Sequence, residues 1–292
     1  MNFRIGCAVW AYKSWVGDLF PPKSRASDFL NLYSRRFTCV EGNTTFYSIP
    51  SVETVKRWAS QTPLGFQFCP KLPKSLTHNG LLMPSLDRSL QFLKLMQGLD
   101  DHLGVLFAQL PPSYSPTKFD DLANFLHGWA ETQAPLALEV RHPDWFKAPE
   151  RDRLNTLLQS LNIGRVLLDT RPIYDCDDDP QTTSERKKPK LPLQLDRTAP
   201  FSLIRFISHP TLENNRSYLE QWTSTIDQWL RSGTQVYFFV HCPVEERSPT
   251  NARYFQHLLE TRNPLVPPLP WDAIRANCDS EGTDPPSQLK LF

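Results

Sequence analysis

The chain has 292 residues, of which 40% are hydrophobic and 22% are charged, and this composition excludes disordered and fibrous proteins. A formal net charge of +1 excludes the strong basic excess of proteins that coat nucleic acid or anionic membranes. No apolar run approaches the roughly 20 residues that cross a bilayer, and the N-terminus lacks an export signal pattern. We therefore expect a cytoplasmic protein that has no membrane partner.

Eight short apolar segments are predicted to be buried β-strands. They begin near residues 3, 38, 66, 103, 136, 163, 201 and 235. These starts lie roughly 27 to 38 residues apart, which suits one strand, one helix and two loops. Amphipathic stretches follow most of the strands and predict helices over residues 27–36, 51–61, 86–99, 118–132, 150–161, 214–232 and 249–262.

The regular alternation of strand and helix predicts an α/β fold, and eight such units predict a single (β/α)8 barrel of the TIM type. Residues 170–200 hold no amphipathic stretch and are predicted to form a long loop between strands six and seven. An open nucleotide-binding sheet is disfavoured because no glycine-rich phosphate-binding motif follows a strand. We expect a barrel domain over residues 1–262 and a flexible, proline-rich, polar tail over residues 263–292.

Polar residues cluster at the carboxyl ends of the predicted strands. Because side chains alternate across a strand, Ala137, Glu139 and Arg141 share one face, which is predicted to point into the barrel. The same alternation in four other strands gives inward-facing sets that end in Glu41 and Asn43, Lys71, Gln109, and His241. Barrel enzymes build their active sites at this end of the strands, so we place the candidate site there.

The residue types at this end are suited to acid–base chemistry. Paired carboxylates with displaced pKa values can act as acid and base, while lysine and arginine hold an anionic group. The predicted catalytic residues are Glu41, Lys71, Glu139 and Asp169. The predicted substrate-binding residues are Trp10, Asn43, Tyr47, Arg141, His142, Trp145, Arg171, Arg205 and His241. The alternatives are a structural ion-pair network at the barrel mouth and aromatic rings that only cap the core.

A divalent metal ion is a further alternative for the same end of the barrel. Glu41, Glu139, Asp169 and His241 offer oxygen and nitrogen ligands of the kinds that such ions accept. The sequence contains no H-E-x-x-H or similarly tight ligand spacing. The identity of any cofactor therefore stays unknown from the sequence.

Four motifs resemble the YecE-like family, domain of unknown function seventy-two. They are CVEGNTTFY at residues 39–47, EVRHPDWF at 139–146, LDTRP at 168–172 and RKKPK at 186–190. The resemblance covers nearly the whole chain and includes LIRFI at residues 203–207. It implies a TIM barrel, in agreement with the strand count, and it implies no reaction because the activity of the family is unassigned.

The last five residues resemble the peptide by which bacterial proteins dock on the DNA sliding clamp. The pattern Gln-Leu-x-Leu-Phe is formed by Gln288, Leu289, Leu291 and Phe292. It arises by chance in a chain of this length with a probability on the order of one percent, given average residue usage. Such a peptide anchors its apolar side chains in a groove of the partner. The alternative is that these side chains fold back onto the barrel.

Three functional hypotheses follow from the sequence. The first is an enzyme, such as a hydrolase or another acid–base catalyst, that acts on a small polar anionic substrate, for example a phosphorylated one, at the barrel mouth. The second is a nucleic-acid processing or accessory factor that docks on the sliding clamp through residues 288–292. The third is a binding module that senses an anionic metabolite without turnover.

Overall fold

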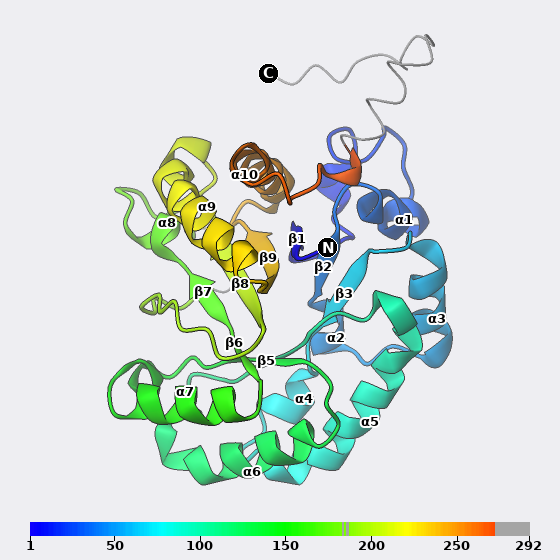
Figure 1. Cartoon of the computed structure of the whole chain (residues 1–292). Coiled ribbons are helices and arrows are strands. Elements are labelled where there is room, and N and C mark those ends of the chain that lie inside the picture. Colours follow the sequence, from blue (N-terminus) through cyan, green and yellow to red (C-terminus); the bar gives the residue numbers. More distant parts are fainter. Residues whose placement is uncertain (183, 185–186, 272–292) are drawn as a thin grey trace.

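The computed structural model describes residues 1–271 with the exception of residues 183, 185 and 186. Its strands are parallel and lie at the centre of the molecule, surrounded by helices (Figure 1). They are β1 (Phe3–Cys7), β2 (Cys39–Gly42), β3 (Gln67–Pro70), β4 (Leu106–Gln109), β5 (Leu136–Glu139), β6 (Gly164–Arg165), β7 (Leu167–Asp169), β8 (Phe201–Ile207) and β9 (Gln235–His241). These ranges confirm the eight predicted segments, because β6 and β7 are two parts of the sixth.

The strands hydrogen-bond in the orders β1-β9-β8-β7, β2-β3 and β4-β5-β6. Between β6 and β7, the backbone N–H of Val166 donates to Leu138 O at 2.9 Å, so the two short strands occupy one position beside β5. Single parallel bridges from Phe68 to Leu103 and from Lys71 to Phe107 join β3 to β4. The fold is therefore α/β, with parallel sheets arranged like those of a TIM barrel.

A tyrosine hydroxyl joins β1 to β2. The Oη atom of Tyr33 accepts from the backbone N–H of Cys7 at 2.6 Å and donates to the carbonyl of Cys39 at 3.1 Å. A Cβ atom on Gly6 would lie 1.9 Å from that same carbonyl oxygen. The close approach of the two strands therefore requires glycine at position 6.

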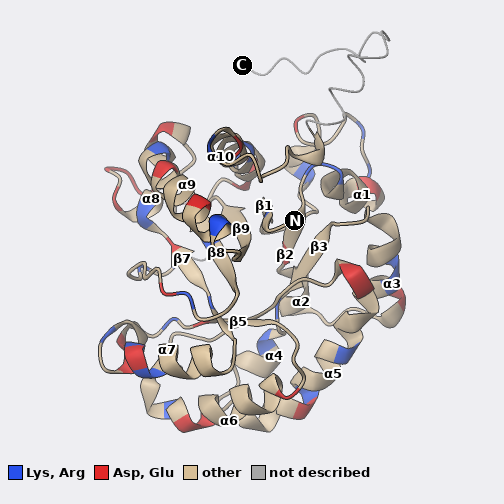
Figure 2. Ribbon diagram, in the orientation of Figure 1, with Lys and Arg blue, Asp and Glu red and all other residues tan. Residues whose placement is uncertain are grey.

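The predicted amphipathic stretches form the outer helices (Figure 1). These are α1 (Phe29–Ser34), α3 (Val52–Gln61), α5 (Leu86–Met96), α6 (Phe119–Ala130), α7 (Glu150–Ser160), α9 (Arg216–Arg231) and α10 (Ser248–Arg262). Short helices α2 (Thr44–Tyr47), α4 (Lys74–Thr77) and α8 (Arg171–Tyr174) follow β2, β3 and β7. Side chains of both charges occur on α5 and α7 (Figure 2), whereas α6 carries only the two acidic residues Asp120 and Asp121.

The segment between β7 and β8 contains the one-turn helix α8 and, in its described residues, no longer helix. It is held at several points by side chains, including the bond from Asn155 Nδ2 to Asp196 Oδ2 at 2.8 Å. Gln194 Nε2 also donates to the carbonyl of Phe146 at 2.9 Å. The predicted long loop is thus a tethered segment rather than a free one.

The barrel interior confirms the predicted alternation of side chains. One buried apolar cluster contains Cys39, Cys69, Val105, Phe107, Ala137, Val166, Phe201, Leu203, Tyr237 and Phe239. Seven of these ten residues share the strand face of a residue that was predicted to point inward. They are Cys39, Cys69, Val105, Phe107, Ala137, Tyr237 and Phe239. The charged residues at the ends of the same faces therefore sit directly above this apolar layer.

The packed part of the chain continues past the predicted domain end at residue 262. Val266 and Leu269 are buried in the main core, and Gln256 Nε2 donates to the carbonyl of Pro267 at 2.9 Å. The segment up to Trp271 thus packs on the barrel. Among the described residues, no helix is long and apolar enough to span a bilayer.

Candidate functional site

A buried arginine holds two carboxylates together at the carboxyl ends of the strands. Arg205, on β8, donates from Nε and Nη2 to the two oxygens of Glu41, at 2.9 Å each. Its Nη1 donates to Glu139 Oε2 at 2.7 Å. All three side chains are almost completely buried. The bidentate geometry suits a guanidinium and fixes both carboxylates in place.

The network extends toward the barrel mouth through Arg141. Its Nε donates to Glu139 Oε1 at 2.6 Å, and its Nη2 donates to Gln109 Oε1 at 2.7 Å. Lys71 Nζ donates to the same Gln109 oxygen at 2.8 Å and to Asn43 Oδ1 at 3.4 Å. Gln109 and six predicted site residues therefore lie in one connected cluster. The six are Glu41, Asn43, Lys71, Glu139, Arg141 and Arg205.

Both carboxyl groups of this network are ionised at neutral pH. Burial raises the pKa of each, but the charge of Arg205 opposes it, so the pKa of Glu139 is lowered to about 2 and that of Glu41 lies well below its ordinary value. His241 adds a bond from Nε2 to Glu41 Oε2 at 2.7 Å. Because their oxygens already accept bonds from cations and an imidazole, these carboxylates are suited to positioning rather than to proton transfer.

Histidine 241 is neutral in this setting. Its burial lowers its pKa to about 4, and the nearby charge of Arg205 acts in the same direction. Because the Glu41 carboxylate can only accept, the imidazole proton lies on Nε2.

Lys71 has the environment of a proton acceptor. Burial and, to a smaller extent, the charge of Arg205 together lower the pKa of its ammonium group to about 7. Its Nζ lies 4.1 Å from the ring centroid of Phe46 and 5.1 Å from that of Phe107. A lysine with a pKa near neutrality can take up and release a proton under ordinary conditions.

A cavity of about 620 Å³, here called the mouth cavity, opens above this cluster. Six cationic side chains line it: Lys71, Lys74, Arg141, Lys187, Lys188 and Arg205. The other lining residues are Ala8, Val9, Asn43, Phe46, Tyr47, His78, Gln109, His241 and Glu245. Its size suits a small metabolite.

Nine lining residues lie outside the predicted site, and they include Lys188 and Glu245, two ionisable groups whose pKa values are strongly shifted by burial. Lys188 comes from the β7–β8 segment, where its N–H donates to Gln181 Oε1 at 2.6 Å and its carbonyl accepts from the Tyr174 hydroxyl. Burial lowers the pKa of Lys188 to about 8. Glu245 follows β9 and belongs to none of the four motifs, whereas Lys188 belongs to the RKKPK motif at residues 186–190.

The structure does not bring Asp169 and Arg171 into the cluster. Asp169 accepts from Arg171 Nε at 2.9 Å and from Trp222 Nε1 at 2.8 Å, in the layer between β7 and α9. The reason is alternation, because Asp169 shares the parity of Leu167, which packs in the outer core, and not that of the inward-facing Val166. The prediction that Asp169 faces the mouth is therefore wrong.

The aromatic residues and His142 that were predicted to bind substrate do not all lie at the mouth cavity. Trp10 packs on Trp58 in the main core, and Trp145 is fully buried, with Nε1 bonded to Tyr114 O at 2.8 Å. These two rings cap the core, as the alternative interpretation expects. His142 accepts from the N–H of Asp144 and lines a neighbouring cavity. Tyr47 is 68% exposed at the edge of the mouth cavity.

The four residues predicted as alternative metal ligands do not form one group. Glu41, Glu139 and His241 surround the guanidinium of Arg205, whose charge would repel a cation at that place. Asp169 lies elsewhere. The arrangement around Arg205 therefore does not fit a divalent ion.

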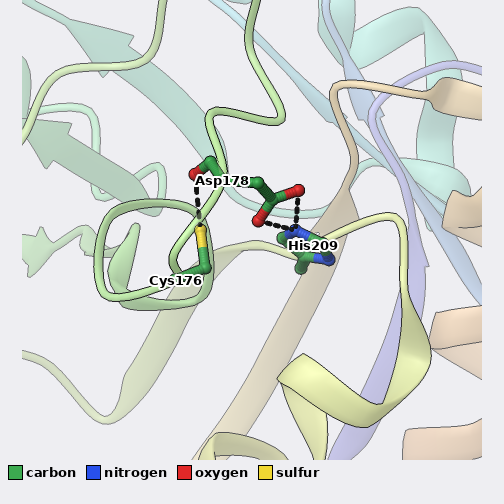
Figure 3. Close-up of side chains that lie close together, drawn as sticks. All are labelled: Cys176, Asp178 and His209. Carbon is green, nitrogen blue, oxygen red and sulfur yellow. Dashed lines mark hydrogen bonds and ion pairs between the residues drawn. The ribbon is translucent and has the colours of Figure 1, made fainter.

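A second group with metal-ligand chemistry consists of Cys176, Asp178 and His209 (Figure 3). His209 Nδ1 accepts from the N–H of Thr211 at 2.9 Å, so its proton lies on Nε2, which contacts Asp178 Oδ1 at 3.0 Å. A metal on Nε2 would require the proton to move to Nδ1, where it would face the Thr211 N–H. We therefore interpret this group as an anchor of the β7–β8 segment.

Comparisons with known proteins agree with the motif resemblance. The family described as "Protein of unknown function DUF72" matches residues 4–273. The UPF0759 protein YecE of Escherichia coli K12 is 34% identical over 99% of each chain. The UPF0759 protein YunF of Bacillus subtilis is 29% identical over 50% of this chain and 52% of its own.

Two crystal structures share the fold. A DUF72 family protein from Thermotoga maritima matches with a TM-score of 0.66 and 21% identity, over 89% of this chain and 100% of that one. A DUF72 family protein from Enterococcus faecalis V583 matches with a TM-score of 0.65 and 14% identity, over 89% and 94%.

Proposed function

We propose that this chain, which belongs to the DUF72 family, is an enzyme that carries out acid–base chemistry on a small polar anion in the mouth cavity. Hydrolysis of a phosphorylated compound is one reaction of this kind. The observation that carries the proposal is the position of Lys71, a buried amine with a pKa of about 7 in the wall of a cationic cavity. A pKa close to the working pH is what a general base requires.

The charges around the cavity favour an anionic ligand. Arg205 and Arg141 offset the charges of Glu41 and Glu139 beneath the cavity floor. Lys187 is paired with Asp179 at 2.7 Å, so Lys71, Lys74 and Lys188 leave an excess of positive charge in the wall. A concave surface with one sign of charge concentrates ligands of the opposite sign.

The roles differ from one residue to the next. Lys71, in its neutral form, would accept a proton from the substrate or from a water molecule. Arg141 would stabilise negative charge that develops on the substrate, because it reaches the cavity and is already oriented by Glu139 and Gln109. Glu41 and Glu139 would act as positioning residues through the arginines.

The test is a comparison of substrate consumption. Purified wild-type protein and a Lys71→Met variant are each incubated with the anionic fraction of a bacterial metabolite extract, and metabolites are quantified by mass spectrometry. We expect at least one anion to be consumed by the wild type, with the rate reduced about 100-fold or more in Lys71→Met, as for loss of a general base. Lys118→Met, which alters a lysine outside the mouth cavity, serves as the control.

Binding of an anion without its consumption would contradict the enzyme proposal and favour the metabolite-binding module. Equal consumption by the wild type and Lys71→Met would remove Lys71 from the mechanism. Thermal melting curves for each variant show whether it is folded.

A separate proposal concerns the C-terminal peptide, which lies outside the described residues. It rests on the sequence pattern of Gln288, Leu289, Leu291 and Phe292. If this peptide docks on the sliding clamp, deletion of residues 288–292 should weaken binding of the purified clamp by more than about tenfold in a titration, because the apolar anchors are lost. Equal binding by the full and the truncated chains would contradict it.

A further inference from the structure

Glu245 contributes the one carboxyl group that lines the mouth cavity among the residues described. It begins a 3-10 turn, Glu245–Arg247, that follows β9 and precedes α10. Its backbone position is fixed, because its carbonyl accepts from Trp15 Nε1 at 3.1 Å. The side chain is therefore presented to the cavity from a well-anchored turn.

One oxygen of the Glu245 carboxyl group lacks a hydrogen-bond donor, although the group as a whole interacts with the Ser248 hydroxyl and the backbone of Cys242. Its Oε1 atom is buried and has no hydrogen-bond partner within the described residues. The other carboxylates beside the cavity floor, Glu41 and Glu139, accept bonds on both oxygens. An acceptor left unsatisfied in the protein interior is costly, so a ligand that supplies a donor gains binding free energy there. Rotation of the carboxyl group, whose terminal torsion is broad, can turn either oxygen toward the cavity.

The protonation state of Glu245 narrows the choice of ligand group. Burial raises its pKa to about 8, although the hydrogen bond with Ser248 and the charge of Lys188 oppose the rise. At neutral pH the group is mostly a carboxylic acid, which both donates and accepts. A hydroxyl group has the same dual character. An ammonium group would instead be repelled by Lys71, Lys188 and the other cations of the wall.

We propose that Glu245 binds a hydroxyl group of the substrate while the cations of the mouth cavity hold its anionic group. The substrate class is then a hydroxylated anion, such as a phosphorylated sugar or polyol. This inference rests on the proposed function, because it requires that the cavity bind an anion. Glu245 would recognise the hydroxyl group of the substrate, which the cations of the mouth cavity cannot distinguish.

Two probes of the same carbon skeleton test it by calorimetric titration at pH 7. Glycerol 3-phosphate carries two hydroxyl groups, and n-propyl phosphate carries none. We expect wild-type protein to bind glycerol 3-phosphate about tenfold more tightly, the effect of one well-made hydrogen bond to a buried group. In Glu245→Met this ratio should fall to about one while propyl phosphate binding is retained.

The conservative variant Glu245→Gln keeps a donor and an acceptor, so it should retain most of the preference. Glu246→Met is the matched control, since the neighbouring Glu246 bonds to Tyr12 and does not line the cavity. Its ratio should equal that of the wild type. Melting curves establish that each variant is folded before titration.

The outcomes separate the two proposals. If both probes bind wild-type protein equally, or if Glu245→Met keeps the preference, the inference about Glu245 is overturned and the anion site stands. If neither phosphate binds wild-type protein at millimolar concentration, the cationic site of the proposed function fails, and the role of Glu245 fails with it.

Discussion

An Arg205→Met variant is expected to lose roughly 3–5 kcal/mol of unfolding free energy at pH 7, the usual cost of removing one partner from a buried ion pair. Arg205 is 2% exposed and donates to both Glu41 and Glu139. Its removal leaves two buried carboxylates that face each other without the cation between them. The free energy is measured by urea denaturation followed by tryptophan fluorescence.

Two comparisons make this result specific to the buried network. Arg216→Met removes an exposed partner of Glu213, at 3.4 Å, and should cost less than about 1 kcal/mol because surface pairs contribute little. Adding Glu41→Gln and Glu139→Gln to Arg205→Met should recover part of the loss, since no buried charge then remains unpaired. A loss in Arg205→Met no larger than that in Arg216→Met would contradict the proposed importance of the network.

The loss of unfolding free energy in Arg205→Met depends on pH, because the pKa values of Glu41 and Glu139 are lowered in the wild-type protein. The pKa of Glu139 is about 2 in the folded protein, whereas that of an unfolded glutamate is about 4.3. The network therefore contributes its full stability above about pH 4.3 and loses it as the pH falls toward 2. In Arg205→Met the carboxyls can protonate at higher pH, so the stability difference from wild type should shrink as the pH is lowered from 7.

The sequence predicts the inner face of the barrel well because that face follows a local rule. Alternation assigned Glu41, Lys71, Glu139 and His241 to the mouth, and the structure brings all four together with Arg205 and Arg141. The same rule, applied to the sixth strand, would have placed Asp169 beside Leu167 in the outer layer. Its position near a strand end misled the prediction.

The ion pairs of the site are harder to predict from the sequence than the positions of its residues. Both glutamates were predicted to handle protons, yet their oxygens are taken by arginines that come from β8 and from the end of β5. Which cation meets which carboxylate depends on strand register and side-chain rotamers, and periodicity does not encode these. Glu245 was missed because it lies in the turn between β9 and α10, beyond the strand positions that alternation assigns to a face.

Selective acylation of Lys71 at neutral pH is the expected consequence of its lowered pKa. At pH 7 about half of Lys71 is the neutral, reactive amine, whereas an ordinary lysine with a pKa of about 10.4 is neutral in roughly one molecule in 2500. Lys71 also lines the mouth cavity, so a small reagent can reach it. Even after allowance for its lower basicity and partial shielding, we expect trace acetic anhydride to label it about tenfold faster than an ordinary lysine.

The measurement is peptide mass spectrometry after trace labelling between pH 5 and 10. Nα-acetyl-lysine amide, whose side-chain amine is free, is added to each reaction as an internal standard. The labelling rate of Lys71 should rise with pH and level off above about pH 8, while that of the standard continues to rise toward pH 10. Inorganic phosphate should slow labelling of Lys71 at pH 7, because a nearby anion favours the ammonium form and also blocks access. A rate that climbs with the standard through pH 10 would show that burial does not lower this pKa, and the assignment of Lys71 as the general base would then fail.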